Sequence, residues 1–160
     1  KNKGFRELYT ALNHLSSSEW EICIFGSERP KEEKVLNFKT HYFGHIHNDE
    51  FLRKLYSAAD VMVVPSKMES FGQTASEALS CGTPVVAFDT SGLRDIVKHK
   101  VNGYLAKPFD SMDLARGIQW VLDSKSYDLL ATNSREIATK NFDSNVVAQQ
   151  YIKLYESSIN

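Results

Sequence analysis

Two glutamates with a glycine between them form the most chemically suggestive pattern in this sequence. Glu69 and Glu77 flank Gly72, in a segment that follows the apolar run Val61–Val64 and the turn residue Pro65. A carboxylate can accept hydrogen bonds from two neighbouring hydroxyl groups, and sugars supply such pairs. The first free amides of a helix attract phosphate. If a helix begins near Gly72, the segment suits a nucleoside diphosphate-sugar, with its phosphates at the helix start and one sugar near each glutamate.

The same glutamates also have a purely structural explanation. A glutamate in the first turns of a helix often only caps the helix or interacts with its dipole. The position of the pair strengthens the functional interpretation beside the structural one, because the pair follows a predicted strand, and ligands of parallel sheets bind beyond the carboxyl ends of the strands.

The elements that must position these residues are visible as short apolar runs alternating with segments of helical periodicity. The apolar runs predict strands at residues 20–25, 42–43, 61–64, 85–88 and 103–106. Helices are predicted at about residues 4–15, within 28–38, and at 49–58, 70–80, 92–97, 114–122, 129–139 and 146–155. This alternation predicts an α/β fold with a parallel sheet covered by helices on both faces. The loops after Phe25, Phe43 and Val64 should then lie at the ligand-binding edge.

Length and charge restrict the class of protein. The 160 residues fit a single domain, and the formal net charge of −1 gives no electrostatic footprint for nucleic acid. No apolar run is long enough to cross a bilayer. Cys23 and Cys81 lie in apolar stretches and are expected to be buried, reduced thiols, which suits a cytoplasmic protein.

Other kinds of site receive less support from the sequence. His41, His45 and His47 are close together, but no acidic or cysteine ligand completes a metal site nearby, so no metal is expected. No glycine-rich dinucleotide motif or Walker loop is present. Asp60 and Asp89 do not match a phospho-acceptor domain, which needs an acidic pair after its first strand.

Taken in order, the motifs resemble the carboxy-terminal domain of the GT-B retaining glycosyltransferases of family 4. The resemblance covers almost the whole chain. It lies in the E-x7-E segment Glu69–Glu77, the preceding Ala59–Ser66, the following Ala78–Ala87 with its Gly-x-Pro-Val-Val run, and the later Asn102-Gly-Tyr-Leu. It implies one Rossmann-like half of a GT-B fold, and no cofactor or metal.

The resemblance also implies roles for the matching residues. Glu69 would contact hydroxyls of the transferred sugar, and the backbone amides around Phe71 and Gly72 would hold that sugar. Amides near Thr74 would bind the diphosphate, and Glu77 would bind the ribose hydroxyls.

Further matching positions lie outside this segment. Lys3 would bind the diphosphate, Gly26 would line the nucleotide cleft, and the loop containing Gly44, His45 and Ile46 would lie near the base.

In the family, a strand in the middle of the sheet precedes the lysine, and an arginine often follows that strand. Neither is visible in this sequence. The acceptor-binding domain, which comes first in the family, is not visible either. We therefore expect residues 1–160 to be a single donor-binding domain from a longer two-domain enzyme, inactive alone. Any peripheral membrane contact would come through the other half.

The expected function is transfer of a hexose from a nucleoside diphosphate-sugar to an acceptor hydroxyl, in polysaccharide or glycolipid synthesis. Two alternatives stay open. A sugar-nucleotide isomerase of the same architecture would carry acid and base residues in the cleft, mostly from its other half. A non-catalytic nucleotide-binding module would be indifferent to loss of Glu69 or Glu77.

Overall fold

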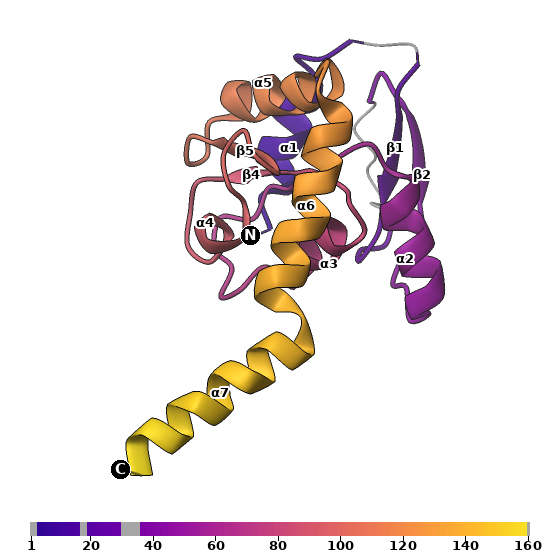
Figure 1. Ribbon diagram of the computed structural model, residues 1–160. Coiled ribbons are helices and arrows are strands. Elements are labelled where there is room, and N and C mark those ends of the chain that lie inside the picture. The colour runs from indigo at the N-terminus through magenta and orange to yellow at the C-terminus, as the bar shows by residue number, and fades with distance from the viewer. Residues whose placement is uncertain (1–2, 17–18, 30–35, 160) are drawn as a thin grey trace.

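A computed structural model describes residues 3–16, 19–29 and 36–159 (Figure 1). Its strands are β1 (Glu21–Ile24), β2 (Lys39–Tyr42), β3 (Met62–Val64), β4 (Val85–Phe88) and β5 (Gly103–Ala106). Its helices are α1 (Phe5–Leu12), α2 (Asp49–Ala58), α3 (Gln73–Ser80), α4 (Leu93–Ile96), α5 (Ser111–Leu122), α6 (Tyr127–Phe142) and α7 (Ser144–Ile159). Every pairing between these strands is parallel, which confirms the predicted α/β fold class.

Among the described residues, the strands are divided between two sheets. β1 pairs with β2 in the smaller sheet, and the larger sheet has the order β3-β4-β5. The family resemblance implied an additional strand in the middle of a single sheet. No described strand pairs with both β1-β2 and β3-β4-β5, so the two sheets are separate among the described residues.

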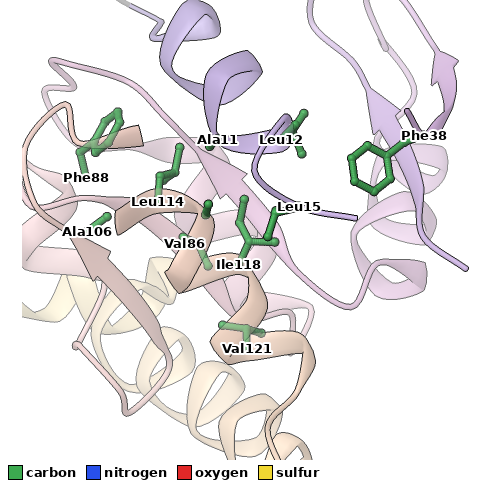
Figure 2. Close-up of a cluster of buried hydrophobic side chains, with 11 residues drawn as sticks. Ala11, Leu12, Leu15, Phe38, Val86, Phe88, Ala106, Leu114, Ile118 and Val121 are labelled. Carbon is green, nitrogen blue, oxygen red and sulfur yellow. The ribbon is translucent and has the colours of Figure 1, made fainter. Parts of the chain in front are cut away.

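Strand β4 is buried on both faces, and its side chains alternate between two hydrophobic clusters. Val86 and Phe88 pack with residues of α1 and α5 (Figure 2). Val85 and Ala87 point to the opposite face and pack with residues of α3, α4 and α6. All four side chains have 0% exposure. The larger sheet is therefore the middle layer of a helix–sheet–helix arrangement, as predicted.

The smaller sheet is packed less completely. Ile22 and Ile24 are half-buried, whereas Cys23 between them is exposed. The prediction that Cys23 is buried is wrong, because β1 alternates between a packed face and an open face. Phe38, just before β2, belongs to the same hydrophobic cluster as Leu12 and Leu15 and so joins this sheet to the body of the protein (Figure 2).

Some predicted boundaries differ from those in the structure. Helix α1 ends at Leu12 rather than at residue 15, because the next residues form tighter i→i−3 hydrogen bonds. Helix α3 begins at Gln73 rather than at residue 70, because Gly72 has a left-handed backbone with φ of 91°. The predicted short helix within residues 28–38 falls largely on residues outside the described ranges.

The last helix, α7, extends away from the rest of the fold (Figure 1). It carries exposed large side chains at Tyr151, Ile152, Leu154 and Tyr155. Within the described residues, no helix combines the length and the apolar character that spanning a membrane requires.

The start of α1 lies directly against the loop that follows β3. Gly4 is buried with φ of 63°, and a Cβ atom at this position would lie 1.8 Å from the Pro65 carbonyl oxygen. Only glycine permits both this backbone conformation and this close approach. Gly4 therefore fixes the position of Lys3 relative to the Pro65 loop.

We expect Gly4→Ala to destabilise the protein much more than Gly82→Ala does. Gly82 has a similar φ of 81°, but a Cβ there would meet its nearest atom, the Ala131 carbonyl oxygen, at an ordinary 3.6 Å. Both variants should lose roughly 1–2 kcal/mol through the left-handed backbone, and Gly4→Ala should lose about 1–3 kcal/mol more through overpacking. Urea unfolding measures both values, and equal losses would show that the approach to Pro65 is unimportant.

Asp113 in α5 links that helix to the end of β5. Its carboxylate accepts hydrogen bonds from the Lys107 amide at 2.7 Å, the Tyr104 hydroxyl at 3.0 Å and the Arg116 guanidinium at 3.1 Å. Burial alone would raise the pKa of Asp113, but these hydrogen bonds outweigh it and hold the pKa below its ordinary value.

Replacing Asp113 with Asn should therefore reduce stability in a pH-dependent way. Because the folded-state pKa is lowered, the stabilisation is present above the unfolded pKa and is lost as the pH falls through the folded value. Asp113→Asn should cost about 1–3 kcal/mol at pH 7, and the difference from the parent should shrink below about pH 4. Urea midpoints across pH measure this. Glu136→Gln, at an exposed carboxylate on α6, is the control and should change little.

Candidate functional site

The loop from Pro65 to Gly72, between β3 and α3, holds Glu69 by several contacts. Glu69 Oε1 accepts a hydrogen bond from Ser66 Oγ at 2.8 Å and lies 2.5 Å from Lys3 Nζ. The Glu69 amide donates to Ser91 Oγ at 3.0 Å, in the loop that follows β4. Ser66 is only 2% exposed, so the carboxylate is anchored from the interior while Lys3 approaches from the surface.

These contacts determine the charge state of Glu69. Partial burial alone would raise the pKa of Glu69, but the hydrogen bonds from Lys3 and Ser66 outweigh it and lower that pKa. The carboxylate is therefore ionised at neutral pH and able to accept hydrogen bonds from hydroxyl groups.

Gly72 is the N-cap of α3 and turns the chain into the helix. A Cβ atom there would lie 2.9 Å from Leu93 Cδ2, so the turn is closely packed on α4. By the geometry of any α-helix, the first amides of α3, at Gln73 and Thr74, lack partners within the helix, whereas the Ala75 amide donates to the Gly72 carbonyl oxygen at 2.9 Å. Phe71 is 47% exposed, and its ring packs edge-on against Phe142 at 5.5 Å between centroids. Phe71, Gly72 and Thr74 therefore all lie at the start of α3.

Glu77 lies in the second turn of α3, and both of its carboxylate oxygens are held. Oε2 accepts a hydrogen bond from the Tyr56 hydroxyl of α2 at 3.0 Å, and Oε1 accepts one from Gln73 Nε2 at 3.0 Å. A carboxylate oxygen that accepts one hydrogen bond can accept a second. Glu77 can therefore still bind two neighbouring hydroxyl groups, one on each oxygen.

The loops after β1 and β2 lie together. The Gly26 amide donates to the Gly44 carbonyl oxygen at 2.7 Å. His45, the next residue, is exposed, and Ile46 is half-buried. Phe25, immediately before Gly26, packs its ring against Tyr56 at 5.7 Å between centroids. This contact connects the two loops to Glu77 through Tyr56.

The histidines do not assemble into a metal site in the part of the chain that the structure describes. There, no group of three or more His, Cys, Asp or Glu side chains could hold a metal ion. His41 instead lies 2.7 Å from Glu21 across β1 and β2.

Sequence reasoning did not identify the residues that hold the two glutamates. These are Ser66 and Ser91 for Glu69, and Tyr56 and Gln73 for Glu77. The i, i+4 spacing of Gln73 and Glu77 is the signal that was available, since residues four apart are neighbours on a helix. Tyr56 lies on the buried face of α2, where a tyrosine hydroxyl needs a partner.

Comparison with solved structures supports the fold. Sucrose-phosphate synthase from Thermosynechococcus elongatus superposes with a TM-score of 0.83 and 31% identity, over 99% of this chain and 43% of that one. HepE from Anabaena, solved in complex with UDP-glucose, superposes with a TM-score of 0.80 and 27% identity, over 98% of this chain and 46% of that one.

Comparison of sequences agrees. An uncharacterized glycosyltransferase of Methanocaldococcus jannaschii is 34% identical over 122 residues, which are 76% of this chain and 31% of that protein. The chain therefore spans less than half the length of these relatives. Residues 1–141 match the family of glycosyl transferases, group 1. On this match, and with the Rossmann-like fold of its GT-B neighbours, the chain belongs to the group 1 glycosyltransferase family.

Proposed function

We propose that this chain is the donor-binding domain of a retaining glycosyltransferase of family 4, which transfers a hexose from a nucleoside diphosphate-sugar to an acceptor hydroxyl. The observation that carries the proposal is the placement of Lys3, Glu69 and Glu77 around the first two turns of α3. The lysine and the free helix amides suit the diphosphate of such a donor, and the two carboxylates suit the hydroxyl groups of its two sugars.

Glu77 is the proposed ligand of the ribose. The Tyr56 hydroxyl and the Gln73 amide each occupy one acceptor direction of the carboxylate, one on each oxygen. The second direction on each oxygen suits a pair of adjacent hydroxyls, such as the ribose 2′ and 3′ groups. The loops that carry Gly26 and Gly44, with His45 and Ile46, would then lie beside the base.

The diphosphate is proposed to lie between the first-turn amides of α3 and Lys3. Helix amides and the helix dipole favour negative charge at this end. Lys3 contacts Glu69 in the structure, but its side chain is 78% exposed. The exposed lysine can turn from Glu69 to a phosphate, and the Glu69 carboxylate, which is only 19% exposed, then keeps its hydrogen bond from Ser66.

Glu69 is the proposed catalytic carboxylate that contacts the hydroxyls of the transferred sugar, with the amides of Phe71 and Gly72. During transfer, the bond from the anomeric carbon to the diphosphate breaks, and a bond to the acceptor oxygen forms as that hydroxyl passes its proton to an oxygen of the leaving diphosphate. Lys3 and the helix amides would stabilise the charge that develops on the leaving diphosphate. We propose that these groups act without a metal or other cofactor.

The acceptor is proposed to bind a second, amino-terminal domain, since this chain covers only 43% and 46% of the two solved relatives. The exposed apolar side chains of α7 would contribute to contacts with that domain. We further propose that the whole protein acts in the cytoplasm, in polysaccharide or glycolipid synthesis, and reaches a membrane only through its other half. The UDP-glucose complex of HepE makes UDP the first nucleotide to test.

Calorimetric titration of the full-length protein with UDP, GDP, ADP and their sugar conjugates tests this function. One diphosphate should bind, and Glu77→Ala should raise its Kd at least tenfold, because hydrogen bonds to a charged group are worth about 1.5–3 kcal/mol each. Glu69→Ala should leave the Kd of the diphosphate unchanged and remove the additional affinity of the sugar conjugate.

Glu50→Ala serves as the matched control. Glu50 is an exposed carboxylate of α2 that pairs with Lys54 within its own helix. The donor-site proposal fails if no diphosphate binds, or if Glu77→Ala binds the diphosphate as tightly as Glu50→Ala does.

A further inference from the structure

Apart from Ser66, Tyr56 is the most buried of the side chains that contact Glu69 or Glu77, and it is held at three points. Its exposure is 3%. Its carbonyl oxygen accepts a hydrogen bond from Thr83 Oγ1 at 2.7 Å, and its ring packs edge-on against Phe25. Its hydroxyl donates to Glu77 Oε2 at 3.0 Å.

Each of these contacts comes from a different part of the fold. Thr83 lies two residues before the start of β4, Phe25 follows β1 and Glu77 belongs to α3. The position of the Tyr56 hydroxyl is therefore set by both sheets, and its hydrogen bond restrains one oxygen of the Glu77 carboxylate. Gln73, the other partner of Glu77, is exposed and lies on the same helix, so it cannot supply the same constraint.

We propose that Tyr56 is a positioning residue for nucleotide binding, which orients the Glu77 carboxylate so that its remaining acceptor directions face the two ribose hydroxyls. This inference rests on the proposed donor site at Glu77. It assigns to Tyr56 a role in discriminating ribose from sugars that lack those hydroxyls, without any contact between Tyr56 and the nucleotide.

The chemistry of the pair suits this role. Burial, together with the adjacent Glu77 carboxylate, raises the pKa of the Tyr56 hydroxyl well above its ordinary value. The hydroxyl therefore stays protonated and donates across the physiological pH range. A donor that never ionises leaves the carboxylate negative and leaves its free lone pairs for the ligand.

The test compares Tyr56→Phe with the parent protein, using the tightest-binding diphosphate among UDP, GDP and ADP and the 2′,3′-dideoxy analogue of the same diphosphate. Tyr56→Phe should raise the Kd of the ribonucleotide about tenfold, since a hydrogen bond to a charged group is lost. The Kd of the dideoxy analogue should change less than about twofold, because it makes no hydrogen bond to Glu77. Adding Tyr56→Phe to Glu77→Ala should have no further effect.

Tyr104→Phe is the matched control, because Tyr104 also donates to a carboxylate, Asp113 Oδ1, at 3.0 Å. It should lower the unfolding midpoint without changing either Kd. The inference is overturned if Tyr56→Phe binds the ribonucleotide normally while Glu77→Ala binds it weakly. It is also overturned if Tyr56→Phe weakens both nucleotides equally, since that shows a purely structural role. Normal ribonucleotide binding by Glu77→Ala would instead overturn the proposed donor site itself.

Discussion

The burial of β4 on both faces is the constraint on which the geometry of the site depends. Each residue of Val85–Phe88 packs into one of two opposed clusters, so the strand cannot slip or tilt without losing core contacts on both sides. Parallel pairing with β3 then brings the ends of the two strands to the same edge. The loops after them are joined there by hydrogen bonds, from the Glu69 amide to Ser91 Oγ and from the Gly92 amide to the Glu69 carbonyl oxygen.

The two glutamates are supported in the same way, although they lie in different local structures. Glu69 is in a loop and Glu77 is in a helix, yet each accepts a hydrogen bond from a hydroxyl that is almost completely buried, that of Ser66 or Tyr56. Each also has a more exposed partner, Lys3 or Gln73. A buried donor limits the rotation of the carboxylate, whereas an exposed partner can be displaced by a ligand at small cost.

The sequence predicted the elements of the fold better than it predicted the contacts between them. Strand β4 was predicted with its observed bounds, because a strand buried on both faces is a continuous apolar run. The start of α3 was placed too early, because the sequence does not reveal that Gly72 has a positive φ. Glu69 and Glu77 were identified from their spacing and the family resemblance. Tyr56 was missed because it is 21 residues from Glu77, and no local periodicity reports a contact between two helices.

The division of the strands into two sheets has a consequence for how the protein opens. The smaller sheet has one exposed face, whereas the larger one is covered on both. Local opening of β1 and β2 should therefore need less free energy than opening of β4, and their backbone amides should exchange hydrogen with solvent faster. These two sheets, each with the loops and helices beside it, form two structural units. A ligand that contacts Gly44 in the unit of the smaller sheet and Glu77 in the unit of the larger sheet would need both units in order to bind. Its binding free energy would then be added to the cost of separating the two units, which makes them unfold as one cooperative body.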